Sequence, residues 1–321
     1  MKPVAFVFPG QGSQAVGMLD AWGDHPAVAE TLAEASDALG EDVAALIHQG
    51  PKEALALTTN TQPVMLVAGV AAWRAWRAEG GDLPAAVAGH SLGEYSALVA
   101  AEVLTLAQAA PLVRFRAAAM QEAVPVGEGA MAAVLGLDAE KVIAGCAEAT
   151  QAMGSSTEVV EAVNFNDPAQ TVIAGSKAAV EKACEVLKGM GARRALPLPV
   201  SAPFHSSLMK PAAEKLREKL AGISLATPRI PVVNNIDVAL EDEASRIRDA
   251  LYRQAFGPVR WVECVRKVKA MGISHVVECG PGKVLAGMTK RIDAAMEGSA
   301  LYDPATLAEA KALVAGLAGR D

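Results

Sequence analysis

Residues 85–95, Ala-Ala-Val-Ala-Gly-His-Ser-Leu-Gly-Glu-Tyr, join a short apolar run to a serine flanked by glycines. The run Ala85–Gly89 predicts a buried strand, and Glu94–Ala101 predicts the helix that follows it. Residues 89–93 lie between the two and fit the G-x-S-x-G pattern of a nucleophile elbow. Such a turn exposes the serine hydroxyl at the N-terminus of a helix, so we predict that Ser91 is a nucleophile.

The pattern also has a purely structural interpretation, a glycine-rich turn closed by a capping serine. The strand before Ser91 and the helix after it are the context that an elbow requires, and they favour the nucleophile. In that arrangement the backbone N–H of Leu92 would point at the oxyanion that forms during the reaction.

Strand and helix patterns alternate along most of the chain. Apolar runs bounded by Gly, Pro or Asn predict further buried strands at Val4–Phe8, Ile230–Val233 and Val276–Cys279. Helical spacing of apolar residues predicts helices over Pro63–Arg77 and from Leu208 to Leu220. Because strands that alternate with helices pair in parallel, we predict an α/β fold with a mainly parallel sheet.

The segment 128–198 has a different order of elements. The pattern predicts strands at Ala130–Leu137, Val159–Asn164, Gln170–Ala174 and Arg194–Leu198, with helices at Ala139–Ala149 and Lys177–Met190. This βαββαβ order is typical of a small ferredoxin-like subdomain. We therefore expect residues 128–198 to be inserted in a larger domain formed by residues 1–127 and 199–321.

Composition and charge exclude several classes of protein. Of 321 residues, 52% are apolar, which supplies a large core, and the net charge is 29 − 36 = −7. An acidic chain argues against nucleic-acid binding, because phosphate contacts need an excess of Lys and Arg. The four cysteines lack metal or disulfide spacing, and no apolar stretch is as long as a bilayer span. We expect a reduced, soluble, cytoplasmic protein with no membrane partner.

A nucleophilic serine needs a base, and five histidines are available. His205 lies in Pro-Phe-His-Ser, a rigid turn that leads from a loop into a helix, where catalytic side chains often occur. His90 adjoins Ser91, so its side chain is expected to point away and to support the turn. The other three, His25, His48 and His275, are expected to be structural.

A glycine loop, residues 9–14 (Pro-Gly-Gln-Gly-Ser-Gln), follows the first strand. It imitates the dinucleotide-binding fingerprint, but no strand ending in Asp or Glu follows near position 30. We favour a second oxyanion donor, the backbone N–H of Gln11. Gly280-Pro281-Gly282-Lys283 resembles a phosphate loop only superficially, and we expect a strand-to-helix turn there.

Six separated motifs occur together along nearly the whole chain. They are residues 10–14 (Gly-Gln-Gly-Ser-Gln), residues 89–94 (Gly-His-Ser-Leu-Gly-Glu), Arg116 with Met120 and Gln121, residues 164–166 (Asn-Phe-Asn) with Gln170, residues 203–206 (Pro-Phe-His-Ser), and residues 280–282 (Gly-Pro-Gly). In this order they resemble the malonyl-CoA:acyl carrier protein transacylase family of fatty-acid synthesis. The resemblance implies an α/β-hydrolase-like core with a ferredoxin-like subdomain, in agreement with the order of elements.

The resemblance also implies catalytic roles. Ser91 would be acylated, and His205 would be its base and later the acid for the departing thiol. The family orients this histidine with a backbone carbonyl, which matches Gln254 here, rather than with an acidic residue. The N–H groups of Gln11 and Leu92 match the oxyanion hole.

The family's substrate contacts fall on three further residues. Arg116 would hold the free carboxylate of the malonyl group, although on sequence alone it also fits a solvated helix arginine. Met120 lies on the same face of that helix. Phe204 replaces a serine that some relatives carry, and a bulky side chain there suits an unbranched malonyl group.

The implied reaction is a ping-pong transfer from malonyl-CoA to the thiol of acyl carrier protein, with release of coenzyme A. It requires no metal and no cofactor. We expect a monomer, and the chain's length slightly favours a carrier of fatty-acid synthesis over one of polyketide synthesis. Because the chain is acidic, the surface that meets an acidic carrier protein must be locally basic.

Three alternatives stay open. A serine hydrolase with the same elbow would need an acid, for which Asp138 and Asp167 are candidates, although they fit a helix cap and a turn. A non-enzymatic scaffold could keep the fold without the activity. Binding of a nicotinamide through residues 9–14 would predict stabilisation by that cofactor.

Overall fold

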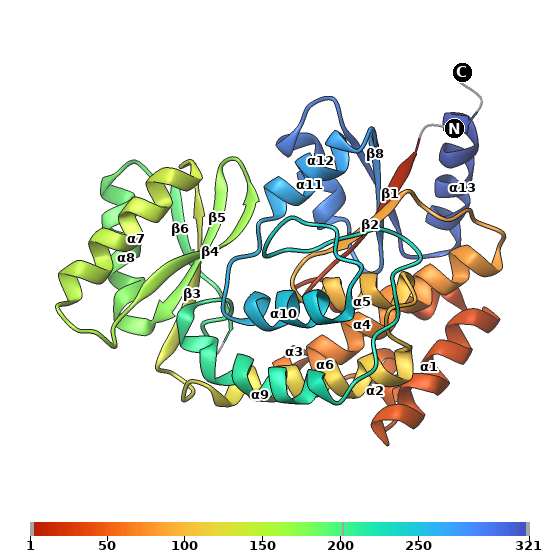
Figure 1. Ribbon diagram of the computed structural model, residues 1–321, viewed down its shortest axis with the longest axis horizontal. Helices are drawn as coiled ribbons and strands as arrows, with labels where there is room; N and C mark the ends of the chain where they lie inside the picture. Colours follow the sequence, from red (N-terminus) through yellow and green to blue (C-terminus); the bar gives the residue numbers. More distant parts are fainter. Residues whose placement is uncertain (1–2, 201, 319–321) are drawn as a thin grey trace.

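The chain folds around two separate β-sheets, as the computed structural model of residues 3–200 and 202–318 shows (Figure 1). The first sheet has the strand order β7-β2-β1-β8-β9, and all of its neighbouring strands are parallel. Its strands are β1 (Val4–Phe8), β2 (Ala86–Gly89), β7 (Val232–Val233), β8 (His275–Cys279) and β9 (Glu297–Leu301). The predicted parallel sheet is therefore confirmed.

The parallel sheet is buried on both faces, which explains why its strands are continuous apolar runs. Alternate residues of β1 point to opposite faces. Phe6 and Phe8 belong to the core on one side, whereas Ala5 and Val7 belong to the core on the other. Each face is covered by helices, so the ends of the strands are where side chains can reach solvent.

The helices have the following bounds along the chain. They are α1 (Pro26–Leu39), α2 (Val43–Gln49), α3 (Lys52–Ala56), α4 (Thr58–Ala78), α5 (Gly93–Ala100), α6 (Leu106–Glu122), α7 (Ala139–Met153), α8 (Lys177–Gly189), α9 (Lys210–Ala221), α10 (Ala244–Ala255), α11 (Trp261–Ala270), α12 (Val284–Ile292) and α13 (Pro304–Ala318). Short 3₁₀ turns, η1 and η2, occur at Asp20–Trp22 and Ser207–Met209. Helix α4 packs against α1, α5 and α6 in the main core.

The second sheet is antiparallel and has the strand order β4-β5-β3-β6. Its strands are β3 (Gly129–Leu135), β4 (Val160–Asp167), β5 (Gln170–Ser176) and β6 (Arg194–Pro197). Helices α7 and α8 cover one face of this sheet and close a separate small core (Figure 1). Met131, Val172 and Ala174 face the other way and join the main core.

The two sheets are connected by a short stretch of backbone pairing. Asn164 of β4 forms a parallel bridge with Val259, which lies just before α11. The N–H of Phe165 donates to the Val259 carbonyl at 3.0 Å, and the N–H of Val259 donates to the Val163 carbonyl at 2.8 Å. An edge strand of the antiparallel sheet is thereby fixed to the part of the chain that leads out of α10.

Several predicted boundaries were wrong, among them the ends of the strand predicted at Val159–Asn164 and of the helix predicted at Ala139–Ala149, which extend to Asp167 and Met153. The predicted helix Pro63–Arg77 begins earlier, at Thr58, because the Leu57 carbonyl accepts the N–H groups of Asn60 and Thr61 and closes the first turn. Pro63 therefore lies inside α4. The predicted strand Ile230–Val233 is shortened to Val232–Val233, because only these residues pair with β2.

No helix within residues 3–200 and 202–318 has both the length and the apolar character needed to cross a membrane.

The turn from β2 into α5 leaves no space for a side chain at Gly89. A Cβ there would lie 1.9 Å from the carbonyl carbon and oxygen of Gly93. We predict that Gly89→Ala lowers the free energy of unfolding by about 3 kcal/mol or more, because the backbone atoms cannot move aside. Denaturant-induced unfolding of the purified variant measures this loss.

Gly189→Ala, at the end of α8, is the matched control, because a Cβ at this position would have no other atom within 4 Å. Alanine is the better helix former, so this variant should unfold at the same denaturant concentration as the wild type or slightly higher. Equal stability of the two variants would contradict the packing argument.

Candidate active site

Ser91 lies where β2 turns sharply into α5. Its φ angle is +52°, in the left-handed region that residues with side chains seldom adopt. The backbone N–H of Ser91 donates to Asn235 Oδ1 at 2.8 Å, and its carbonyl accepts from Gln254 Nε2 at 3.0 Å. Side chains from distant parts of the sequence therefore hold both polar backbone groups of this strained residue.

His205 approaches Ser91 from the loop between β6 and η2. It also has a positive φ, +65°, and it is 4% exposed. Its Nε2 lies 2.6 Å from Ser91 Oγ, and its Nδ1 lies 2.8 Å from the backbone carbonyl of Gln254. A proton on Nδ1 that is donated to this carbonyl leaves Nε2 free to accept the serine proton.

Burial keeps the imidazole of His205 neutral. Removal from water lowers the pKa of His205 to about 3, and the nearby charge of Arg116 acts in the same direction. The hydrogen bond to Gln254 opposes this shift without cancelling it. His205 is therefore unprotonated at neutral pH, as a general base must be.

Arg116 brings a positive charge to the same place from α6. The side chain is 1% exposed, and its Nη1 donates to Gln62 Oε1 at 2.6 Å. Its Nη2 donates to Gln254 Oε1 at 3.0 Å and reaches Ser91 Oγ at 3.4 Å. The sequence left open a solvated arginine, and the burial excludes that interpretation.

Ser91, His205 and Arg116 meet in a cavity of about 120 Å³. The cavity is lined by Gln11, Gln62, His90, Ser91, Leu92, Arg116, Met120, Met131, Asn164, Leu198, Val200, Phe204 and His205. Every side chain predicted to bind substrate is in this set, together with the two residues predicted to form the oxyanion hole. Gln254 contacts the cluster from behind through its side chain and its backbone carbonyl.

The candidate acids of a serine hydrolase lie elsewhere. Asp138 caps α7 by accepting the N–H of Lys141 at 2.9 Å. Asp167 accepts the N–H of Ala169 and forms an ion pair with Arg291. The Nδ1 atom that such an acid would orient is taken by a backbone carbonyl.

His90 is directed away from the serine, toward Asn166, whose Oδ1 lies 2.8 Å from its Nε2. The glycine loop at residues 9–14 is held by two of its own side chains: Gln11 Nε2 donates to Thr58 Oγ1, and Gln14 Oε1 accepts the N–H of Gly12. Gly280–Gly282 forms the expected turn between β8 and α12.

No group of three or more His, Cys, Asp or Glu side chains that could hold a metal ion occurs in the described part of the chain.

Sequence reasoning missed three polar residues around Ser91. Gln62 contacts Arg116 and Asn235 contacts Ser91, and Glu94, a 2% exposed carboxylate, lies three residues after Ser91 in the first turn of α5. Glu94 lies inside the motif at residues 89–94, and a Glu in the first turn of an otherwise apolar helix was the available signal. Gln62 and Asn235 carry no such signal, because only the fold brings them to Ser91.

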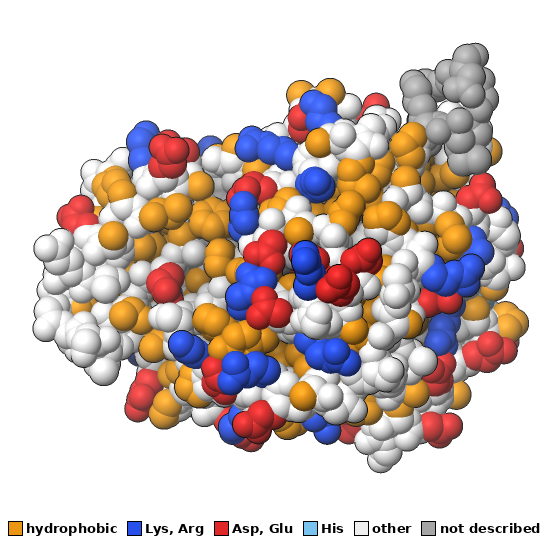
Figure 2. Space-filling view, in the orientation of Figure 1, with side chains coloured by type: hydrophobic (Ala, Val, Ile, Leu, Met, Phe, Trp, Pro, Cys, Tyr) orange, Lys and Arg blue, Asp and Glu red, His pale blue; other side chains and the backbone are white. Residues whose placement is uncertain are grey.

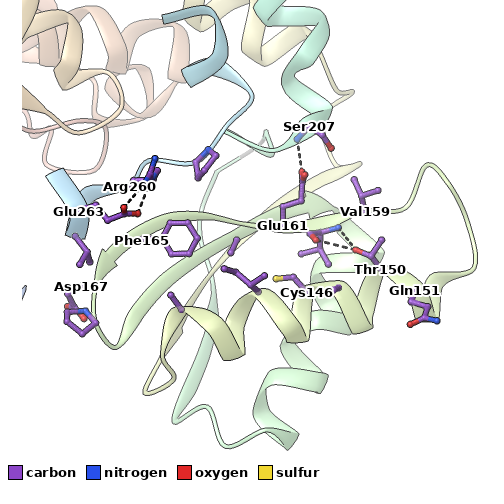
Figure 3. A pocket seen from close by; sticks show the side chains of 18 residues that line it. Cys146, Thr150, Gln151, Val159, Glu161, Phe165, Asp167, Ser207, Arg260 and Glu263 are labelled. Atoms are coloured by element: carbon purple, nitrogen blue, oxygen red, sulfur yellow. Dashed lines mark hydrogen bonds and ion pairs between the residues drawn. The ribbon is translucent and has the colours of Figure 1, made fainter. Parts of the chain in front are cut away.

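A larger groove, of about 940 Å³, lies outside this site (Figure 3). It runs between α7 with β4 and the segment around Arg260. Phe165 and Ile143 contribute apolar surface, and Arg260 and Glu263, which form an ion pair, also line the groove. Neither Ser91 nor His205 lines this groove, so it does not belong to the cavity of the serine and histidine.

Comparison with known proteins identifies the family. The acyl transferase domain family matches residues 5–302. Malonyl CoA-acyl carrier protein transacylase of Salmonella typhimurium is 54% identical over 97% of this chain and 99% of its own length. The chain belongs to the malonyl-CoA:acyl carrier protein transacylase family. A Bacillus subtilis transacylase of this family is 43% identical over 96% of both chains.

Solved structures of transacylases agree over the whole fold. An acyl-carrier-protein S-malonyltransferase from Burkholderia pseudomallei 1710b has a TM-score of 0.94 and 64% identity, covering 97% of this chain and 99% of its own. A malonyl-transacylase in complex with a type II polyketide synthase acyl-carrier protein has a TM-score of 0.94 and 51% identity over 97% of this chain and 99% of its own. This transacylase is therefore an acyltransferase with a mixed α/β fold.

The low pKa of His205 predicts an unusual pH dependence for the reactivity of Ser91 in this transacylase. Sulfonylation of Ser91 by a sulfonyl fluoride, with fluoride as the leaving group, requires neutral His205, and burial lowers the pKa of His205 to about 3. We predict that the reaction rate at pH 5.5 stays within about twofold of the rate at pH 8. A histidine with an ordinary pKa would be mostly protonated at pH 5.5, and the rate would fall roughly tenfold. His205→Ala should react slowly throughout, and a midpoint near pH 6.5 in the wild type would contradict the assignment.

Proposed function

We propose that this chain transfers a malonyl group from malonyl-CoA to the phosphopantetheine thiol of acyl carrier protein through a malonyl-Ser91 intermediate. The observation that carries the proposal is the 2.6 Å contact between Ser91 Oγ and His205 Nε2, with the buried guanidinium of Arg116 in the same cavity. The names of the relatives support the same reaction. A relative solved with an acyl-carrier protein supports this class of partner.

In the first half-reaction, Ser91 Oγ attacks the thioester carbonyl of malonyl-CoA while His205 Nε2 takes its proton. The carbonyl oxygen becomes an oxyanion, which the backbone N–H groups of Gln11 and Leu92 stabilise by hydrogen bonds. When the intermediate collapses, the carbon–sulfur bond breaks and coenzyme A leaves with the proton held by His205. The malonyl group is then an ester of Ser91.

In the second half-reaction, His205 takes the proton of the carrier-protein thiol, and the sulfur attacks the malonyl ester. The same two N–H groups stabilise the second oxyanion. Collapse breaks the bond to Ser91 Oγ, which recovers its proton from His205. The enzyme returns to its starting state, so the sequence of steps is ping-pong and consumes neither metal nor redox cofactor.

Arg116 gives the reaction its preference for a diacid. A guanidinium can hold a carboxylate through two parallel hydrogen bonds. A hydrogen bond to a charged group contributes about 1.5–3 kcal/mol, which corresponds to roughly 10- to 150-fold preference for malonyl over acetyl. An acetyl group would leave this buried charge unpaired and widen the difference.

Met120 and Phe204 limit what the cavity accepts. Both are less than 9% exposed, and both line the space next to Ser91. A cavity of about 120 Å³ suits a short acyl group rather than a long chain. The phenyl ring of Phe204 leaves an unbranched malonyl group as the best fit.

We further propose the domain arrangement that the sequence suggested. Residues 128–198 form a ferredoxin-like subdomain, which the order β4-β5-β3-β6 and the two helices on one face support. Residues 1–127 and 199–321 form the α/β-hydrolase-like catalytic domain, which acts as a cytoplasmic monomer. Basic and acidic side chains are interspersed on the face in Figure 2, so the carrier-binding surface must be a local feature.

Intact-mass measurement tests the proposal directly. The wild type mixed with malonyl-CoA should gain the mass of one malonyl group and lose it when the carrier protein is added. Ser91→Ala should gain nothing, because the attacking oxygen is absent. Release of free malonate at the same rate without carrier protein would instead identify a hydrolase, and an unchanged wild-type mass would contradict the proposal.

Replacement of Arg116 tests the origin of specificity. Arg116→Ala should reduce the rate of malonyl transfer by about 10-fold or more, while the rate of acetyl transfer is kept or increased. Only the malonyl group carries a free carboxylate, which loses its partner in this variant. Initial rates with the two donors, each acting on the same carrier protein, measure the ratio. Equal losses on both donors would remove Arg116 from this role.

A further inference from the structure

A buried carboxylate lies directly behind the turn that carries Ser91. Glu94 is in the first turn of α5 and is 2% exposed. Its Oε2 accepts the backbone N–H of Asn235 at 2.9 Å and the side-chain Nε2 of Gln254 at 3.0 Å. Burial raises the pKa of Glu94 to about 7. The transfer steps above do not use this group.

The first arm of this network holds the strained turn. Glu94 fixes the backbone of Asn235, and the side chain of Asn235 then bonds to Ser91 and to Gly89, two residues before it. Asn235 Oδ1 accepts the N–H of Ser91 at 2.8 Å, and Asn235 Nδ2 donates to the carbonyl of Gly89 at 2.7 Å. These contacts oppose relaxation of the positive φ at Ser91.

The second arm reaches the other two residues of the site. Gln254 donates through Nε2 to Glu94 and accepts the guanidinium of Arg116 at Oε1, 3.0 Å away. Its backbone carbonyl accepts His205 Nδ1. One amide thus lies between a carboxylate and a guanidinium, and the same residue orients the base.

Arg116 needs a counter-charge that does not compete with substrate. Its hydrogen bonds go to the neutral oxygens of Gln62, Gln254 and Ser91. Burial lowers the pKa of Arg116, and among the described residues the Tyr95 phenol and then Glu94 oppose this shift. Of these two, Glu94 is the carboxylate and can carry a negative charge near neutral pH. The side-chain amide of Gln254 lies between Glu94 and Arg116. Because Glu94 does not bond to the guanidinium itself, Arg116 keeps hydrogen-bonding capacity for a ligand carboxylate.

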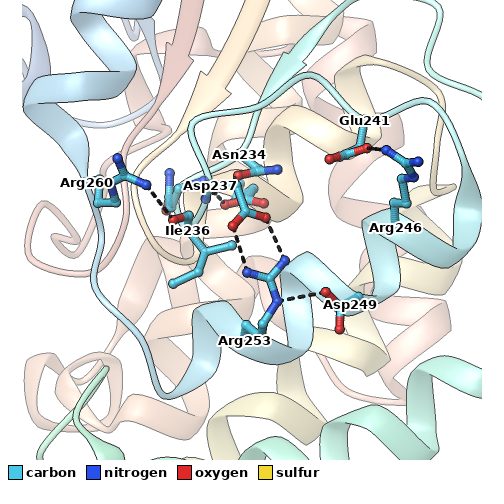
Figure 4. Close-up of polar contacts among 10 residues, drawn as sticks. Asn234, Ile236, Asp237, Glu241, Arg246, Asp249, Arg253 and Arg260 are labelled. Atoms are coloured by element: carbon cyan, nitrogen blue, oxygen red, sulfur yellow. Dashed lines mark hydrogen bonds and ion pairs between the residues drawn. The ribbon is translucent and has the colours of Figure 1, made fainter.

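Ion pairs fix the two arms relative to each other (Figure 4). Arg253, the neighbour of Gln254 on α10, donates to both carboxylate oxygens of Asp237, at 2.7 and 2.6 Å. It also pairs with Asp249 of the same helix. Asp237 lies two residues after Asn235, so this contact holds the turn after β7 against α10 and sets the separation of Asn235 and Gln254.

We propose that Glu94 is a positioning residue for the transfer reaction: through Asn235 it holds the turn of Ser91, and through the Gln254 amide it is the counter-charge of Arg116. The inference rests on the function proposed above. It assigns to one carboxylate the placement of the nucleophile and the strength with which the site binds a negatively charged acyl group.

At pH 8.5, above the pKa of about 7 of Glu94, Glu94→Gln tests the counter-charge, because it removes the charge and keeps the shape and an acceptor oxygen. Loss of a nearby negative charge strengthens the attraction between Arg116 and a substrate carboxylate. We expect the KM for malonyl-CoA to fall by about threefold or more, whereas the KM for acetyl-CoA stays within about twofold. A malonyl KM that is unchanged or higher would overturn this part of the inference.

Glu278→Gln is the matched control. Glu278 is also a fully buried glutamate whose pKa burial raises to about 7, but its Oε2 accepts the N–H of Ala286 in α12, outside this network. This variant should leave both KM values within about twofold of the wild type. A fall in malonyl KM equal to that of Glu94→Gln would overturn the inference, because any buried charge would then have the same effect.

Glu94→Ala tests the placement of the nucleophile. It removes the acceptor shared by Asn235 and Gln254, so kcat for both donors should fall about tenfold or more below that of Glu94→Gln. Equal kcat values in the two variants would contradict the role in holding Ser91. Thermal melting checks that the variants fold, and if Glu94→Ala does not, the KM comparison still decides. A wild type that fails to transfer malonyl would refute the proposed function instead.

Discussion

The 2.6 Å hydrogen bond between Ser91 Oγ and His205 Nε2 is the interaction on which the arrangement of the site depends. Both residues have positive φ angles, so each is held in a conformation that its own backbone disfavours. Conformations of this kind persist only where surrounding contacts enforce them. Here the enforcing contacts come from Asn235, Gln254 and the glycine pair at the turn between β2 and α5.

Burial then gives each polar group its function. The same removal from water that lowers the pKa of His205 also makes an unpaired Arg116 costly and raises the pKa of Glu94. One low-dielectric environment therefore keeps His205 neutral and favours the pairing of Arg116 with a carboxylate. The negative charge that balances Arg116 lies in the same environment, on Glu94. The neutral amide of Gln254 keeps the two opposite charges apart while bonding to both.

Much of the fold and part of the site could be predicted from the sequence, for physical reasons. Strands such as Val4–Phe8 are apolar on both faces. Ser91 lies between Gly89 and Gly93, and glycine is needed at both positions because the tight turn leaves no space for a side chain. The roles of His205 as the base and of Arg116 as the carboxylate-binding residue were implied by motifs whose order resembles a family, and these roles stay predictions. Asn235 and Gln62 could not be found, because their partners are distant in sequence. The predicted start of α4 was wrong, because Pro63 was taken as the first residue of the helix and instead lies inside it.

The bridge between Asn164 and Val259 has a consequence for how the chain behaves among other molecules. An edge strand normally offers unpaired N–H and C=O groups, which are a template for unwanted association with another polypeptide. In β4, part of this template is occupied by the molecule's own backbone. The backbone pairing that joins the two sheets therefore also covers part of the open edge of β4, so fewer of its N–H and C=O groups are left to pair with another polypeptide.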